Sequence, residues 1–169
     1  LKSSRLIFTS CAKYLGVSIS SGLTDDCDIS RQMHGFYVRC NYLVRNFMPC
    51  TDAAKCSRFT SFCANIYAGH CWVNFKQSSL SKITVASNNS FRCFLSYPRY
   101  CRASLMFVSS QVLSFPELLW KCIFNFRQRL LYSTNALIQN IVACFYSSFA
   151  WRHWNRGLYS RFYDNLILI

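Results

Sequence analysis

Apolar residues recur every three or four positions over residues 28–47, which is the period of one face of an α-helix. This stripe consists of Ile29, Met33, Phe36, Tyr37, Cys40, Leu43, Val44 and Phe47. Arg31, Arg39 and Arg45 fall on the opposite side, either as an ordinary solvated face or as a surface that follows a phosphate backbone. The helix is expected to end before Pro49, because a proline disfavours helical geometry in the residue that precedes it.

A short apolar segment before this helix, Tyr14–Ile19, alternates in part and contains β-branched residues, so it predicts a strand. Gly16 interrupts the segment, which is typical of a bulge or of a close backbone approach. Residues 6–8, with the sequence Leu-Ile-Phe, are a second strand-like piece that we expect to pair with it as a hairpin or an edge strand. A turn follows, and Thr24 or Asp25 then caps the long helix.

Four more helices follow from the same period and from helix start signals. They begin at Thr51 or Asp52, at Ser79 or Ser81, after the capping-box pattern Ser114-Phe115-Pro116-Glu117, and at Asn135. The predicted fold class is therefore mainly α, with a short β-hairpin or strand pair at the N-terminus followed by a bundle of about five helices. Three parts are expected: strands in residues 1–23, helices in 24–150, and in 151–169 a tail that is first basic and aromatic, then apolar.

The chain has 169 residues and carries 19 lysines and arginines against 6 aspartates and glutamates, a net charge of +13. With 52% hydrophobic residues it is not a disordered chain, and its charge favours nucleic acid or an anionic membrane surface as a partner. A basic surface without any partner is the alternative. No run approaches the roughly 20 apolar residues of a membrane span, and no secretory signal is found over residues 1–22.

The 11 cysteines are spread through helix-like segments without a Cys-x-x-Cys pair. A disulfide framework is typical of the loops of small secreted chains, so we expect free thiols that act as small hydrophobic side chains. The protein is accordingly expected in a reducing intracellular compartment, the cytoplasm or the nucleus, without a membrane partner.

Carboxylates are too few for metal-dependent catalysis. Half of the six lie in the sequence Asp-Asp-Cys-Asp at residues 25–28, where they are expected to cap the helix and to favour its dipole. A polymerase or nuclease needs carboxylates that converge on a metal pair from separate elements, and Asp52, Glu117 and Asp164 have no obvious partners. A phosphate loop and a nucleophile elbow are also missing from the sequence. We therefore expect no catalytic residue, and the chain alone is not predicted to be an enzyme.

Cys56, Cys63 and His70 recur at intervals of seven on one expected helix face. Seven residues rise about 10 Å along a helix, which is too far for one metal ion to bridge. We expect no metal site, and we expect His70 to be a packed or hydrogen-bonded histidine without a serine or cysteine nucleophile beside it.

Several motifs then occur in a definite order. They are Lys13-Tyr14-Leu15-Gly16-Val17, the acidic residues, a helix with Ile29 and Arg31, then Lys55 and Phe59, the segment Ile66-Tyr67-Ala68-Gly69-His70-Cys71-Trp72, Leu80-x-Lys82-Ile83 to Phe91-Arg92, and Tyr97-Pro98-Arg99. This series resembles the reverse transcriptases of non-LTR (LINE-type) retrotransposons over about residues 2–145. The matching part is the one that follows the catalytic Tyr-x-Asp-Asp box of those enzymes.

The resemblance implies that residues 1–23 are the end of the palm on the primer side and that 24–150 are thumb-like helices. The parent enzymes carry out RNA-directed DNA synthesis with Mg²⁺, but the catalytic box, the palm and the fingers are missing here and would have to be supplied. The chain is expected to hold no cofactor, to take no small-molecule substrate and at most to bind an RNA/DNA template–primer duplex. The assigned residues are Arg31, Arg39, Arg45, Lys82, Arg92 and Arg99 for nucleic-acid binding, with Tyr14, Leu15 and Gly16 on the primer side.

Departures from the family pattern indicate a degenerate copy. Ala68 stands where the family has a glycine, and Arg58 and Cys71 stand where apolar residues are expected. Two alternatives stay open. The chain is either a non-functional pseudogene remnant or a basic helical module that binds nucleic acid or membrane and is unrelated to polymerases; the second alternative leaves the ordered motifs unexplained.

Overall fold

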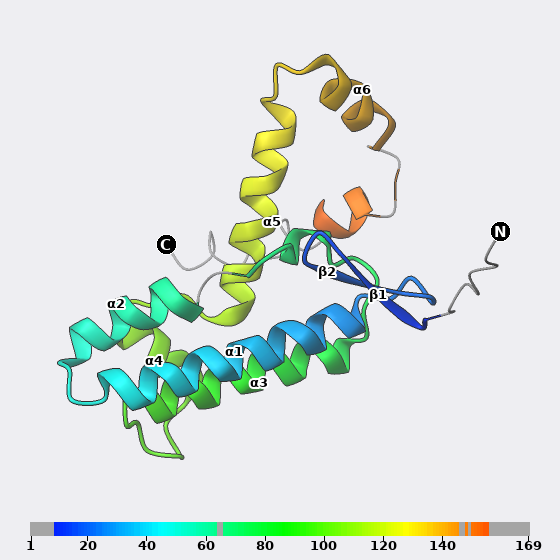
Figure 1. Cartoon of the computed structure of the whole chain (residues 1–169). Helices are drawn as coiled ribbons and strands as arrows, with labels where there is room; N and C mark the ends of the chain where they lie inside the picture. Colours follow the sequence, from blue (N-terminus) through cyan, green and yellow to red (C-terminus); the bar gives the residue numbers. More distant parts are fainter. Residues whose placement is uncertain (1–8, 64–65, 146–147, 149, 156–169) are drawn as a thin grey trace.

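The computed structural model describes residues 9–63, 66–145, 148 and 150–155 (Figure 1). Its elements are β1 (Cys11–Tyr14), β2 (Val17–Ser20), α1 (Asp26–Phe47), α2 (Asp52–Cys63), the 3₁₀ helix η1 (Gly69–Cys71), α3 (Gln77–Phe94), α4 (Ala103–Ser109), α5 (Phe115–Leu131) and α6 (Ala136–Phe145). The mainly α class with an N-terminal hairpin is confirmed, and α1, α2, α3, α5 and α6 match the expected helices. The seven-residue α4 is an addition that the hydrophobic period did not reveal.

The hairpin differs from the expected one. Strands β1 and β2 are antiparallel, Tyr14 pairs with Val17, and Leu15 and Gly16 form the two-residue turn between them. Their φ angles of 45° and 80° are both positive, as a type I′ hairpin turn requires. The prediction of one strand over Tyr14–Ile19 was therefore wrong, because an apolar residue in the turn position extended the pattern across the bend. The proposed partner strand at residues 6–8 lies outside the described residues.

Helices α1 and α3 lie side by side and form the long axis of the bundle, with α2 and α4 at the end away from the hairpin (Figure 1). The core at that end, here called the distal core, consists of Phe36, Cys40, Leu43, Phe59, Cys63, Phe91, Phe94, Leu95, Met106, Phe107 and Val112. Aromatic rings fill its centre, and Phe91 contacts Phe59 and Phe107 at centroid distances of 4.8 and 4.6 Å.

A second core, here called the hairpin-side core, lies where α5 leaves the bundle. It consists of Ile29, Trp72, Ile83, Phe115, Leu119, Ile123, Trp151 and Trp154. Helix α5 starts with the predicted capping box, in which Ser114 and Glu117 make both reciprocal bonds. Trp151 and Trp154, which the sequence grouped with the tail, are buried here on a short helical stretch over residues 150–155.

Helix α6 packs on α5 and otherwise extends away from the main bundle (Figure 1). Among the described residues, no helix has the length and apolar character needed to cross a membrane.

Candidate nucleic-acid interface

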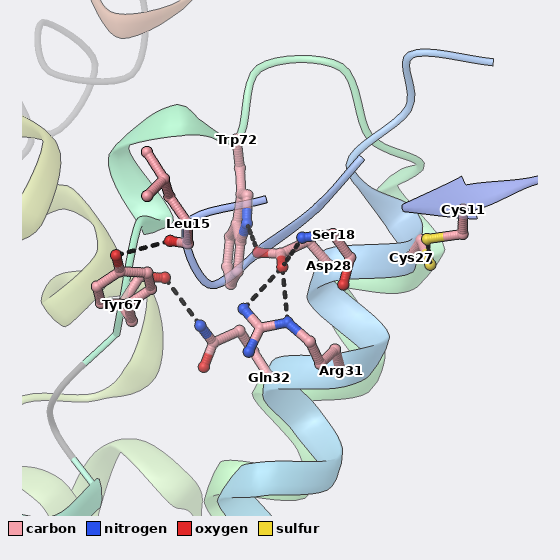
Figure 2. A network of polar contacts seen from close by, with 9 residues as sticks. All are labelled: Cys11, Leu15, Ser18, Cys27, Asp28, Arg31, Gln32, Tyr67 and Trp72. Atoms are coloured by element: carbon pink, nitrogen blue, oxygen red, sulfur yellow. Dashed lines mark hydrogen bonds and ion pairs between the residues drawn. The ribbon is translucent and has the colours of Figure 1, made fainter. Parts of the chain in front are cut away.

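Asp28 is the centre of a polar network that joins three distant segments (Figure 2). Its carboxylate is 1% exposed. Oδ1 accepts the backbone N–H of Ser18 at 2.9 Å and the Nε and Nη2 groups of Arg31 at 2.9 and 2.7 Å. Oδ2 accepts the indole N–H of Trp72 at 2.9 Å. Because every partner is a donor or a cation, the buried charge is compensated, and β2, α1 and the segment after η1 are fixed to one another.

The two neighbouring aspartates act on the same segment. Asp25 is the N-cap residue of α1, but its Oδ2 accepts the backbone N–H groups of Val73 and Asn74 at 2.8 and 2.7 Å. Asp26 accepts the N–H of Lys76 at 3.0 Å, and hydrogen bonds from Ser79 and from that N–H lower the pKa of Asp26. Asp25, one of the two expected caps, thus lies at the N-cap position, but its side chain binds the loop after Trp72 and makes no cap hydrogen bond to the helix.

Tyr67 holds the hairpin turn from the other side (Figure 2). Its hydroxyl donates to the carbonyl of Leu15 at 2.9 Å, and its own carbonyl accepts the side-chain amide of Gln32 at 2.8 Å. A Cβ on Gly16 would lie 2.9 Å from Cε1 of Tyr67, so this close approach and the positive φ both require glycine. Ala68, which follows Tyr67 in the sequence, has a φ angle of 58°, and this left-handed conformation also favours glycine.

The turn is thus anchored through its backbone, while the side chains of Tyr14 and Leu15 face solvent. Tyr14 is 65% exposed and Leu15 is 74% exposed. At the open end of the hairpin, away from the turn, the thiols of Cys11 and Cys27 lie 2.7 Å apart and connect β1 to α1 (Figure 2). This contact raises the pKa of the Cys27 thiol.

Five of the six basic candidates fall into two groups. Arg45, Lys82 and Arg99 are exposed. Arg31 is bound to Asp28, and Arg92 donates to Asn89 Oδ1 at 2.7 Å and to the carbonyl of Cys101 at 3.1 Å. The first three are therefore available for an external ligand, whereas these two are already used in the fold.

Arg39 departs most from its expected position. It lies at the edge of the buried face of α1 instead of opposite the apolar stripe, where it lines a cavity of about 10 Å³ together with Gln32 and Cys63. Its Nε is buried and makes no hydrogen bond to any residue that the structure describes. The reason is that the apolar stripe of α1 is wide, so Arg39, which directly precedes the buried Cys40, lies at the border of the stripe.

All the carboxylates within the described residues are engaged in the fold. Besides the three in the network, Asp52 lies 3.7 Å from Lys55 and Glu117 accepts the N–H of Ser114 at 2.6 Å. The sixth, Asp164, lies outside the described residues. Exposed cations thus face solvent with few competing anions, a charge distribution typical of nucleic-acid binding surfaces.

His70 lies in η1, beyond the end of α2 at Cys63, so it does not share a helix with Cys56 and Cys63. It stacks on Phe126 at a centroid distance of 4.0 Å, and its Nδ1 lies 3.7 Å from the thiol of Cys122. Burial lowers the pKa of His70 and raises the pKa of Cys122, so both stay neutral near pH 7. His70 is packed as expected, but the expectation that no cysteine pairs with it was wrong, because Cys122 lies 52 positions away along the chain, where sequence periodicity gives no signal.

Comparisons of the chain with models of protein families, with curated proteins and with solved structures found no match. The residues and their geometry are therefore what bears on the function of this chain. In the part of the chain that the structure describes, no group of three or more histidine, cysteine or acidic side chains is arranged to hold a metal ion.

Proposed function

We propose that this chain is a fragment of the RNA-directed DNA polymerase of a non-LTR retrotransposon, from the region after the Tyr-x-Asp-Asp box, and that it binds a template–primer duplex. One observation carries this proposal. The motifs that form the resemblance, around Gly16, Asp28 and Tyr67–Trp72, are far apart in sequence but meet in one hydrogen-bonded unit. If these motifs were inherited together as one structural unit, this explains both their order in the sequence and their contact in space.

The exposed turn at Tyr14–Leu15 is the primer-side element in this proposal, and Arg45, Lys82 and Arg99 contact phosphates. Arg31, a third of whose side chain is exposed, lies near the turn and is held there by Asp28, which balances its charge. Arg39 and Arg92 add to the positive electrostatic potential of the surface more than they contact phosphates directly. Catalytic carboxylates and Mg²⁺ belong to the parent enzyme, so the chain binds nucleic acid without extending a primer.

Phosphate contacts predict a steep salt dependence. Fluorescence anisotropy with a labelled RNA–DNA hybrid of about 20 base pairs should give a log affinity that falls linearly with log salt, with a slope of about −0.9 per phosphate neutralised. The double variant Lys82→Gln/Arg99→Gln removes two phosphate contacts, so it should make this slope shallower by about 2. Lys121→Gln, which removes an exposed lysine of α5, is the matched control.

The proposal fails if affinity is unchanged between about 50 and 200 mM salt, or if the control variant costs as much as the double variant. Pelleting with anionic liposomes in place of the hybrid distinguishes the membrane-binding alternative. Binding to liposomes but not to the hybrid would replace this proposal by that one.

A further inference from the structure

The corner between α1 and α2 carries an exposed aromatic cluster that duplex binding does not use. Tyr42 is 50% exposed and Phe62 is 38% exposed. Their rings stack at a centroid distance of 5.9 Å with an interplanar angle of 30°. Phe47 meets the edge of Tyr42 at 6.3 Å, and the guanidinium of Arg58 lies over Phe47, 5.4 Å from its centroid. We call Tyr42, Phe47, Arg58 and Phe62 the aromatic platform.

Positive charge surrounds this platform. Arg58 precedes Phe62 by one helical turn, and Arg45 follows Tyr42 by almost one turn, so both arginines flank the stacked rings. The sequence has no carboxylate between Ile29 and Phe47 or between Ala53 and Cys63. Asp52, at the start of α2, is already paired with Lys55. The charge complementarity therefore favours an anionic ligand that also offers flat apolar groups.

Single-stranded nucleic acid has this chemistry, because its bases stack on aromatic side chains while its phosphates bind cations. We infer that the aromatic platform binds an unpaired strand of DNA or RNA, with a base stacked on Tyr42 and a phosphate held by Arg58. Phe62 fixes the plane of the Tyr42 ring from one side. The guanidinium of Arg58 lies over the Phe47 ring with its Cζ 5.4 Å from the centroid, and a guanidinium in a cation–π contact can still donate N–H groups to a phosphate.

The ligand class follows from these contacts. Stacking is tolerant of base identity, and an arginine that meets only phosphate reads no base, so binding is expected without sequence preference. A base inside a duplex offers no free face, which makes this surface selective for unpaired strands. The inference does not rest on duplex binding, whose test uses Lys82 and Arg99.

The test is anisotropy with a labelled oligothymidylate of about 15 nucleotides, on the whole chain and on Tyr42→Ala. The substitution should weaken binding about tenfold, whereas Tyr42→Phe should keep it within about twofold. Arg58→Gln should weaken binding and make the salt dependence shallower. Affinity for the RNA–DNA hybrid should stay within about twofold of wild type in Tyr42→Ala, because the duplex makes no contact with this ring.

An abasic oligonucleotide of the same length separates stacking from charge. It should bind the wild-type chain about tenfold more weakly than oligothymidylate, and Tyr42→Ala should not weaken it further. Equal binding of the abasic and thymine strands would overturn the inference, as would unchanged oligothymidylate affinity in Tyr42→Ala. Equal losses for single strand and hybrid would show a shared site and would overturn it too. Unchanged circular dichroism and thermal unfolding of Tyr42→Ala exclude misfolding as the cause.

Discussion

The two ends of the bundle are held together by different interactions. The distal core is built mainly from apolar side chains, with stacked phenylalanines at its centre. The hairpin-side end adds buried hydrogen bonds of Asp28 to segments that lie 10 and 44 positions away along the chain. Apolar burial is not directional and tolerates small shifts, whereas a network of this kind fixes one relative position of its parts. Apolar burial therefore stabilises both ends, and the hairpin-side end also fixes the geometry of the hairpin.

The largest effect is expected from the distal core. Phe91 is fully buried between two other rings, so Phe91→Ala should lower the free energy of unfolding by about 4 kcal/mol through lost burial and a residual cavity. Urea denaturation measures this loss. Tyr100→Ala, at a position that is 89% exposed, should change stability little. A loss below about 1 kcal/mol for Phe91→Ala would show that the distal core does not carry the stability assigned to it.

Asp28→Asn should cost about 3 kcal/mol, because it removes the buried charge that faces Arg31 and leaves donors without a full acceptor. The destabilisation caused by Asp28→Asn should be local. Hydrogen exchange should accelerate first in peptides covering β2 and the segment after η1, before those of α3. The matched control is Asp52→Asn at the other end, where the aspartate of the 3.7 Å ion pair is 82% exposed and the pair should contribute less than about 0.5 kcal/mol. Uniform acceleration across the chain would contradict a separate role for the network.

The thiols of Cys11 and Cys27 offer a covalent test of the hairpin position. Glutathione disulfide, by thiol exchange, should join them with release of two glutathione thiols and stabilise the chain by about 2 kcal/mol across 16 positions. Peptide mass mapping should find this link ahead of links between the other cysteines. Cys27→Ser should abolish both the link and the stabilisation. Preferential linkage of Cys11 to a different cysteine would mean that β1 does not lie against α1.

Ala68→Gly should raise stability by about 0.5 kcal/mol, because glycine adopts the left-handed conformation of this position without the strain of a Cβ. The gain corresponds to an increase in Tm of about 1 to 2 °C. Ala54→Gly, within α2, should have the opposite sign and lose about 1 kcal/mol. Equal losses in both variants would show that Ala68 is not strained in its left-handed conformation.

The sequence predicts the parts of this molecule that depend on neighbours within a helix turn. Stripes at Ile83, Ser87 and Phe91 locate α3, and the Ser114–Glu117 pattern locates the start of α5, because both signals act within a few residues. The hairpin turn was misplaced since Leu15 is apolar in a position with positive φ. The roles of Asp25, Asp28 and Trp72 depend on partners tens of residues away, and periodicity carries no information about those distances.

The most direct test of the account is photocrosslinking of the chain to a template–primer duplex with 5-iodouracil at the 3′ end of the primer, followed by peptide mapping. The account predicts adducts on Tyr14, whose exposed ring stands at the turn fixed by Tyr67 and the Asp28 network. Adducts confined to α4–α6, or no complex with the duplex at low salt, would contradict it.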